Sequence, residues 1–149
     1  MKLILTLLLV MFSAASFALD VKEAIVKVNI TDDTRDRCNL SAKSFESQLE
    51  TVLRQNQIKI KAAGTGPYFH LTVAASEDFP NCFGHSVLQV YTLVGGVNLG
   101  WTNQKRVGIY EHCLRSFSFT RGKGFELQEK INSALADVTR QCISEVLKQ

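Results

Sequence analysis

The chain has 149 residues, of which 46% are apolar, with 17 Lys and Arg against 14 Asp and Glu. This length and composition indicate one globular domain that is large enough to bury a hydrophobic core. The net charge of +3 is too small to predict an electrostatic nucleic-acid binder, which needs a concentrated basic face.

The first 18 residues have the pattern of a secretory signal peptide. Lys2 gives a short positive region, Leu3–Phe12 is apolar apart from one threonine, and Ser16 and Ala18 form a small-x-small cleavage site. The apolar stretch is about half as long as a membrane-spanning helix needs. We therefore expect cleavage after Ala18 and a single soluble domain over residues 19–149, located in the periplasm or, alternatively, secreted.

The periodicity of apolar residues predicts the secondary structure. Strands are indicated where apolar residues alternate with polar ones, and helices where they recur at i, i+3, i+4 and i+7. In chain order we predict strand Val21–Thr31, helix Ser41–Gln55, short edge strand Ile58–Lys61, strand Tyr68–Ala75, strand Ser86–Trp101, strand Arg106–Thr120 and a helix from Phe125 to the C-terminus. Residues 76–84 are interpreted as a loop, 102–105 as a turn, and Gly95-Gly96 as a bulge or bend.

This order of elements predicts the fold class. It reads β-α-β-β-β-α, with a short extra strand after the first helix. Such an order suits an α+β two-layer sandwich, in which a mostly antiparallel sheet carries both helices on one face.

Four cysteines, all after the signal pattern, predict two disulfides in an oxidising compartment. A zinc site would need paired C-x-x-C or H-x(3–5)-H ligands, which are missing. The strand directions place Cys38 and Cys82 at one end of the sheet. Cys113 and Cys142 lie about 23 Å and about 30 Å below that end. We therefore predict the pairs Cys38–Cys82 and Cys113–Cys142. No cysteine precedes Cys38, so we expect no lipid anchor.

The tip of the long hairpin is a candidate protein-binding site. Trp101 is followed closely by Lys105 and Arg106, and an aromatic ring flanked by cations resembles an interface hot spot. The alternative is that Trp101 folds back over the end of the sheet.

A second candidate is an anion site before the last helix. Arg121, Gly122, Lys123 and Gly124 combine two cations with the N–H groups of a helix start, which attract anions. The alternative is a plain glycine turn, because neither a P-loop nor a dinucleotide fingerprint is present.

Catalytic and metal motifs are weak. His85 and Ser86 supply the residue types of a hydrolase, but neighbours on a strand point to opposite faces and no G-x-S-x-G turn occurs. Acidic loop residues could bind calcium, yet the D-x-D-x-D-G pattern is absent, which favours solvated acids. We expect no metal, no cofactor and no enzymatic activity.

The sequence therefore predicts a small exported protein that acts through protein–protein contact, such as an envelope or secretion accessory or an inhibitor or immunity protein. Its partner would be another envelope or secreted protein. The alternatives are a binder of a small molecule or anion and a small hydrolase around His85 and Ser86.

Overall fold

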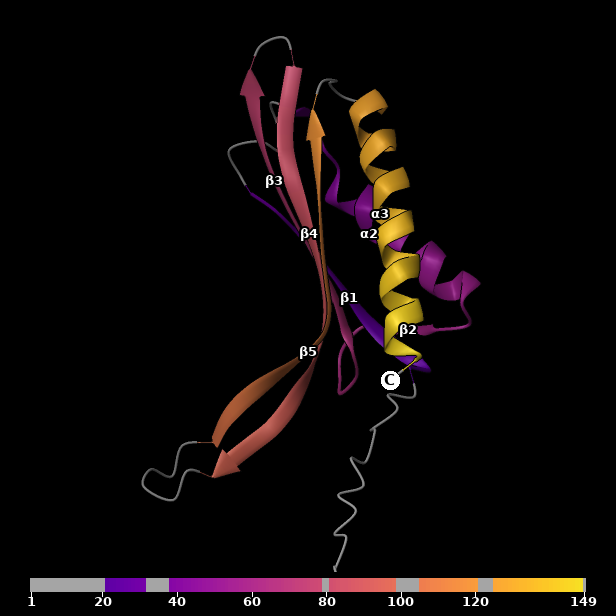
Figure 1. Ribbon diagram of the computed structural model, residues 1–149, viewed down its shortest axis with the longest axis vertical. Helices are drawn as coiled ribbons and strands as arrows, with labels where there is room; N and C mark the ends of the chain where they lie inside the picture. The colour runs from indigo at the N-terminus through magenta and orange to yellow at the C-terminus, as the bar shows by residue number, and fades with distance from the viewer. Residues whose placement is uncertain (1–20, 32–37, 79–80, 99–104, 121–124, 149) are drawn as a thin grey trace, which may run out of the picture.

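The computed structural model describes residues 21–31, 38–78, 81–98, 105–120 and 125–148, without the side chains of 78, 96–98 and 105–107. Its elements are β1 Glu23–Ile30, α2 Ala42–Gln55, β2 Lys59–Lys61, β3 Tyr68–Asp78, β4 Asn81–Asn98, β5 Lys105–Thr120 and α3 Phe125–Val146 (Figure 1).

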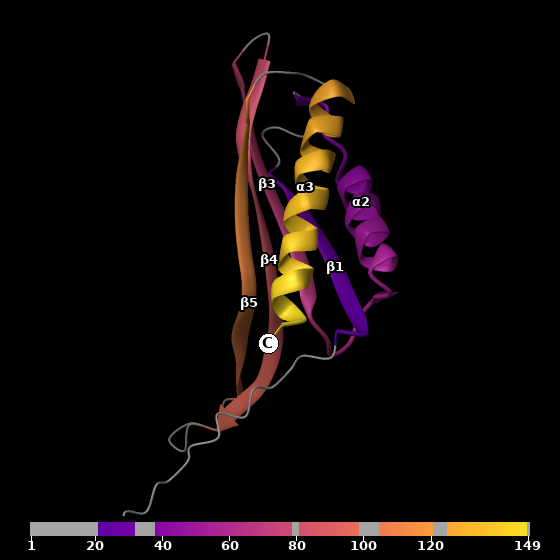
Figure 2. The ribbon, with the colours of Figure 1, turned by 45° about the vertical axis from the view of Figure 1, so that its right-hand side comes forward.

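The five strands form one mixed sheet in the order β2-β1-β3-β4-β5. β1 is parallel to both β2 and β3, whereas the long ladders β3–β4 and β4–β5 are antiparallel. Both helices lie on the same side of this sheet (Figure 2). The predicted α+β two-layer sandwich is confirmed. The antiparallel part is the larger one, although the β1 pairings make the sheet mixed.

Alternate side chains of the strands point to the helices and form the core. In β3 the buried residues are Phe69, Leu71, Val73 and Ala75. The helices contribute one apolar face each, at the spacing seen in the sequence: Phe45, Leu49, Val52 and Leu53 from α2, and Leu127, Ile131, Leu135, Ala136, Cys142, Ile143 and Val146 from α3. The residues between them along each strand form a second sheet face, which no described helix covers. We call it the open face.

Polar contacts fix the start of α2. The Oγ of Ser41 accepts a hydrogen bond from the Ser44 N–H at 3.2 Å, which satisfies a donor that a helix start leaves free. The Ser41 N–H donates to Gln128 Oε1 at 2.8 Å, and Asn132 Nδ2 donates to Ser44 Oγ at 3.1 Å. These bonds attach α2 to α3 as well as capping it.

Two disulfides join the layers. Cys38 bonds to Cys82 in β4, and Cys113 in β5 bonds to Cys142 in α3. These are the two pairs that the strand directions predict. All four cysteines are buried.

The prediction of a loop at 76–84 was wrong. β3 continues to Asp78 and β4 begins at Asn81, so Cys82 and His85 lie in a strand. Gly84 is a residue type typical of turns, but here it lies within β4, where the close packing of its neighbours leaves no room for a side chain. A Cβ there would meet the Ala74 carbonyl oxygen, Ala75 Cα at 2.7 Å and Phe119 Cζ at 2.8 Å. Its hydrogen side chain is what lets the Phe119 ring lie against β3 and β4.

The far end of β4 and β5 differs from the sandwich. Both strands continue beyond the end of α3 and bend away from the helices (Figure 1). A register shift between Val90 and Tyr91 lies where this extension begins, and another lies between Val94 and Val97. The second shift confirms the irregularity predicted at Gly95-Gly96. The prediction of a turn at 102–105 was wrong at Lys105, which begins β5. We call residues 91–98 and 105–112 the β4–β5 arm.

Among the described residues, neither α2 nor α3 combines the length and apolar character that crossing a bilayer requires.

Candidate interaction surface

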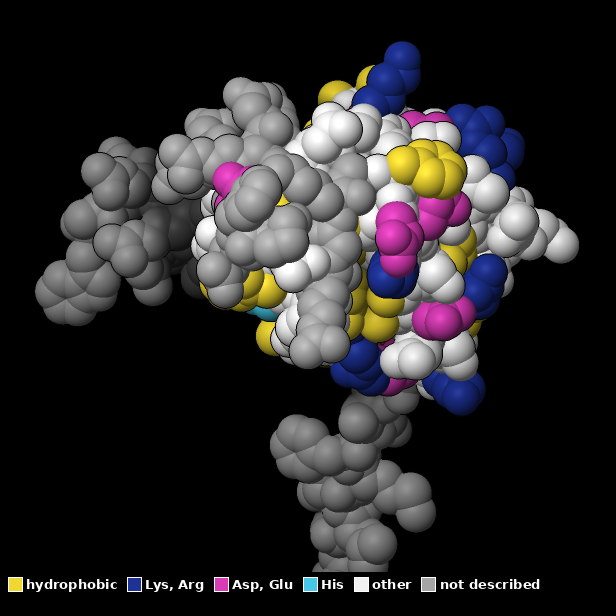
Figure 3. Space-filling view, turned by 90° about the horizontal axis from the view of Figure 1, so that it is seen from above, with side chains coloured by type: hydrophobic (Ala, Val, Ile, Leu, Met, Phe, Trp, Pro, Cys, Tyr) yellow, Lys and Arg dark blue, Asp and Glu magenta, His cyan; other side chains and the backbone are white. Residues whose placement is uncertain are grey.

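The helix layer carries charged side chains of both signs, and several of them form ion pairs. Intrahelical ion pairs join Glu50 to Arg54, Glu126 to Lys130 and Asp137 to Arg140 at 3.1, 2.7 and 2.9 Å. Seen from above, acidic and basic side chains are interspersed and neither sign gathers in one area (Figure 3). Exposed pairs of this kind add little stability. They also leave this side without the single-sign field that steers a charged partner.

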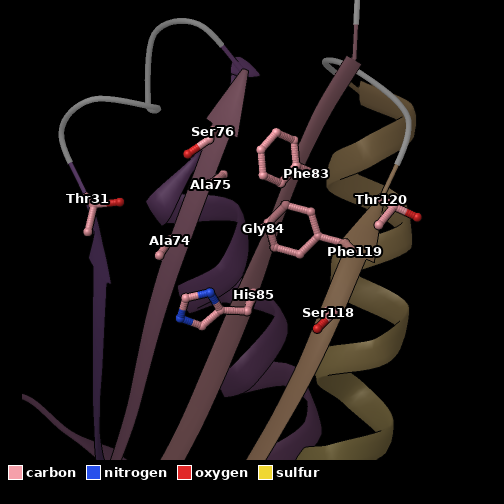
Figure 4. Close-up of a pocket in the computed structure, with 10 residues that line it drawn as sticks. All are labelled: Thr31, Ala74, Ala75, Ser76, Phe83, Gly84, His85, Ser118, Phe119 and Thr120. Atoms are coloured by element: carbon pink, nitrogen blue, oxygen red, sulfur yellow. The ribbon is translucent and has the colours of Figure 1, made fainter. Parts of the chain in front are cut away.

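The open face carries a shallow groove of about 610 Å³ at the end of the sheet where β1 finishes. His85 of β4 lies between Ala74 of β3 and Ser118 of β5 and is exposed (Figure 4). Ser86 is fully buried on the helix side, where its Oγ has no hydrogen-bond partner among the described residues. The two side chains of the hydrolase hypothesis therefore point to opposite sheet faces.

Aromatic residues gather lower on the open face. The rings of Tyr68 and Tyr91 are stacked, with centroids 5.2 Å apart and planes 8° apart. The His70 ring meets Tyr91 edge-on at 6.3 Å, and Lys27 Nζ lies 5.3 Å from the Tyr68 centroid. Asn29 Nδ2 donates to His70 Nε2 at 2.9 Å. The cluster thus links β1, β3 and β4 across the uncovered side.

Burial, and then the positive charge of Lys27, lower the pKa of His70 below its usual value. Both effects favour the neutral ring, which is also the form that can accept the hydrogen bond from Asn29. Burial raises the pKa of Tyr91, and the nearby Tyr68 adds to that rise. Both shifts favour the uncharged side chains of His70 and Tyr91.

The β4–β5 arm exposes apolar side chains on both of its faces. Leu93 and Ile109 are register partners, 48% and 64% exposed. Their neighbours Val94 and Tyr110 point to the opposite side and are 51% and 57% exposed. The Tyr110 ring meets the His112 ring edge-on at 4.8 Å. Isolated apolar residues on a surface are ordinary, but four close together on a ribbon that no described helix covers make a candidate contact surface.

The two binding sites predicted from the sequence, at the hairpin tip and before the last helix, lie wholly or partly outside the described residues. Trp101 and residues 121–124 lie outside the described residues. Lys105 and Arg106 start β5, but their side chains are not described. Within the described ranges, no three His, Cys, Asp or Glu side chains are grouped so that they could hold a metal ion.

Comparison with known proteins gives a distant likeness of shape. No family model and no curated protein sequence matches the chain. Eleven chains of solved structures align with it, including the following three. A minor lipoprotein from Acinetobacter baumannii is 10% identical, with 87% of this chain and 95% of that one covered and a TM-score of 0.40. The hypothetical protein CT253 from Chlamydia trachomatis is 9% identical, with 85% and 96% covered and a TM-score of 0.45. A PelC dodecamer from Paraburkholderia phytofirmans is 12% identical, with 85% and 86% covered and a TM-score of 0.41. At these scores the likeness says nothing about a shared activity.

Proposed function

We propose that this chain is an exported, non-enzymatic protein that acts through protein–protein contact, with the β4–β5 arm as its docking element. The observation that carries the proposal is the exposure of Leu93 and Ile109 on a two-stranded ribbon outside the core. A two-stranded ribbon alone is marginally stable in water. Apolar side chains on both faces of such a ribbon gain most when a partner covers them.

The chemistry of the arm defines the kind of partner. Its exposed residues are aliphatic and aromatic, and Tyr110 adds a hydroxyl that can hydrogen-bond at an interface. Tyrosine is enriched among residues that dominate binding energy. The partner surface should therefore be apolar and shaped to receive a ribbon. The N-terminal signal pattern and the two disulfides support a partner in the envelope or outside the cell.

Site-specific photo-crosslinking in the cells that naturally produce the protein tests this. A photoreactive residue at Ile109 should give one discrete heavier product, which the additional substitution Leu93→Ser should abolish. The matched control places the same residue at Asp137, which is exposed on α3. Near-UV circular dichroism should show that Leu93→Ser leaves the fold intact. Identical products from both positions, or none from Ile109, would contradict the proposal.

A small-molecule binder is the second candidate, supported by the groove around His85 and Ser118. A ligand at about 100 times its dissociation constant adds about 2.7 kcal/mol to the free energy of unfolding. A thermal-shift screen should find such a ligand, and His85→Ala should remove the shift. Ligands that stabilise the parent protein and the His85→Ala variant equally would count against this candidate.

A further inference from the structure

The two edges of the sheet are built differently. β2 is three residues long, and two of them are lysines, which discourage pairing with another strand. β5 is 16 residues long and pairs with β4 on one side only, among the described strands. Its last five residues, Ser116–Thr120, contain no charge and no proline, and both register shifts lie further down. We call Ser116–Thr120 the upper edge.

A groove of about 270 Å³ runs beside the upper edge, between β5 and α3. Phe117 and Phe119 line its sheet side. On α3 the lining residues recur at i, i+3, i+4 and i+7: Leu127, Lys130, Ile131 and Ala134. Lys130 is paired with Glu126 at 2.7 Å, so its charge is compensated at the rim. The upper edge thus offers backbone groups that pair with no described strand, together with an apolar groove on the helix side.

Below the upper edge the same side of β5 is closed by contacts with α3. Arg115 forms an ion pair with Glu145, and Cys113 is bonded to Cys142. An added strand would therefore reach about as far as Ser116. Strand addition works through main-chain hydrogen bonds plus pockets for alternate side chains, and the upper edge supplies both.

We propose that the upper edges of two copies of this chain pair antiparallel about a twofold axis at Ser118, which joins their sheets into one. In that register Phe117 lies opposite Phe119 of the second copy, on the helix side. Ser116 lies opposite Thr120 of the second copy, on the open face, and Ser118 lies opposite its own counterpart.

The segment is self-complementary in this pairing. Aromatic pairs and Ser–Thr pairs across antiparallel strands are favourable, and like charges directly opposite each other are unfavourable. Within Ser116–Thr120 this register gives the Ser–Thr pairs and places no like charges opposite each other, while the Phe119 ring stays packed over Gly84. A twofold interface requires one patch to match itself, which the alternation of phenylalanines and hydroxyls achieves. Phe117 of the second copy, which is only partly buried, would also extend the apolar lining of the groove. The net charge of +3 opposes this association only weakly.

Sedimentation of the purified oxidised protein over a range of concentrations tests the proposal. We expect a reversible dimer. Ser118 is exposed on the open face, so Ser118→Lys should keep the fold while placing two lysines opposite each other. The dimer dissociation constant should rise at least about tenfold. The matched control is Ser76→Lys, the same change on the same face but two strands away from the edge, which should dimerise like the parent.

Hydrogen exchange at low and high protein concentration locates the contact. Amides of residues 116–120 should gain protection in the dimer, while those of the β4–β5 arm should not. Leu93→Ser should leave the dimer unchanged, so this proposal and the proposed function can fail separately. A protein that stays monomeric at high concentration would overturn the inference, as would a dimer that Ser118→Lys does not weaken or one that protects the arm instead. Protection of residues 116–120 that appears only in mixtures with another protein would also overturn it, because the upper edge would then pair with a strand of that protein.

Discussion

The two halves of the β4–β5 hairpin use similar residues in different surroundings. In the upper half, Leu88 and Val90 are fully buried between the sheet and the helices. In the arm, Val94 and Tyr110 lie on the same side of these strands as Leu88 and Val90 but are 51% and 57% exposed. Strand pairing is continuous across both halves apart from the register shifts. The difference in burial between the two halves shows that packing against a helix, and not strand pairing, decides which part of this hairpin belongs to the core.

The largest expected effect comes from removing the Cys113–Cys142 disulfide, which lies where the upper half of the hairpin meets the arm. Cys113 lies next to the register shift where the arm begins, and its disulfide attaches β5 to α3. The double substitution Cys113→Ala and Cys142→Ala should lower the free energy of unfolding by about 3.6 kcal/mol, from the loop entropy of a 29-residue separation. Urea unfolding measures this.

The same experiment on Cys38 and Cys82 is the control, with about 4.0 kcal/mol expected from the separation of 44 residues. Only the first pair should also lower hydrogen-exchange protection in residues 113–120 toward the level of the arm. A loss below about 1 kcal/mol in both variants would show that the layers hold together without the disulfides.

A matched pair of glycines compares the halves directly. Gly84→Ala in the upper half places a Cβ against Ala75 Cα and the Phe119 ring, so it should destabilise by about 1–3 kcal/mol. Gly108→Ala in the arm meets only the Val94 side chain, with Cγ2 at 3.6 Å, and should change stability by less than about 0.5 kcal/mol. Thermal unfolding of both variants gives the difference. Equal losses would mean that the arm is packed as tightly as the core.

The smallest effect concerns the open face, which no described helix covers. Because burial and Lys27 lower the pKa of His70, the unfolded chain binds more protons than the folded chain between that lowered pKa and about 6.5. The free energy of unfolding should therefore decrease as the pH falls through this window. Solvent screening at this partly exposed site keeps the effect below about 1 kcal/mol.

Melting temperatures between pH 7.5 and pH 5.5 measure the effect. His70→Gln should flatten the pH dependence, and His85→Gln, also on the open face, is the matched control variant. If the melting curves of His70→Gln and the parent shift in parallel with pH, His70 does not contribute.

Most of the fold could be predicted because local pattern and tertiary structure agree. Phe45, Leu49, Val52 and Leu53 have helical spacing and are all buried on one side of α2. The loop expected at 76–84 failed because Pro80, Asn81 and Gly84 are turn residues by type. The sequence does not reveal that the Phe119 ring, which is distant along the chain, needs a glycine at 84.

The arm was missed although a signal for it existed. β4 has 18 residues and spans about 59 Å at about 3.3 Å per residue. α3 has 22 residues and spans about 33 Å at about 1.5 Å per residue. A helix of that length leaves about eight strand residues uncovered, which corresponds to the arm. The upper edge could not be foreseen, because its exposure depends on strand order and on where α3 lies.

The disulfides have a consequence for how the chain reaches its final form. The cysteines pair in the order in which they occur, the first with the second and the third with the fourth. When the N-terminus of the chain emerges first, Cys38 and Cys82 are both available before Cys113 appears, and Cys113 and Cys142 follow as the second pair. We therefore expect both bonds to form one after the other, without the rearrangement of an incorrect bond.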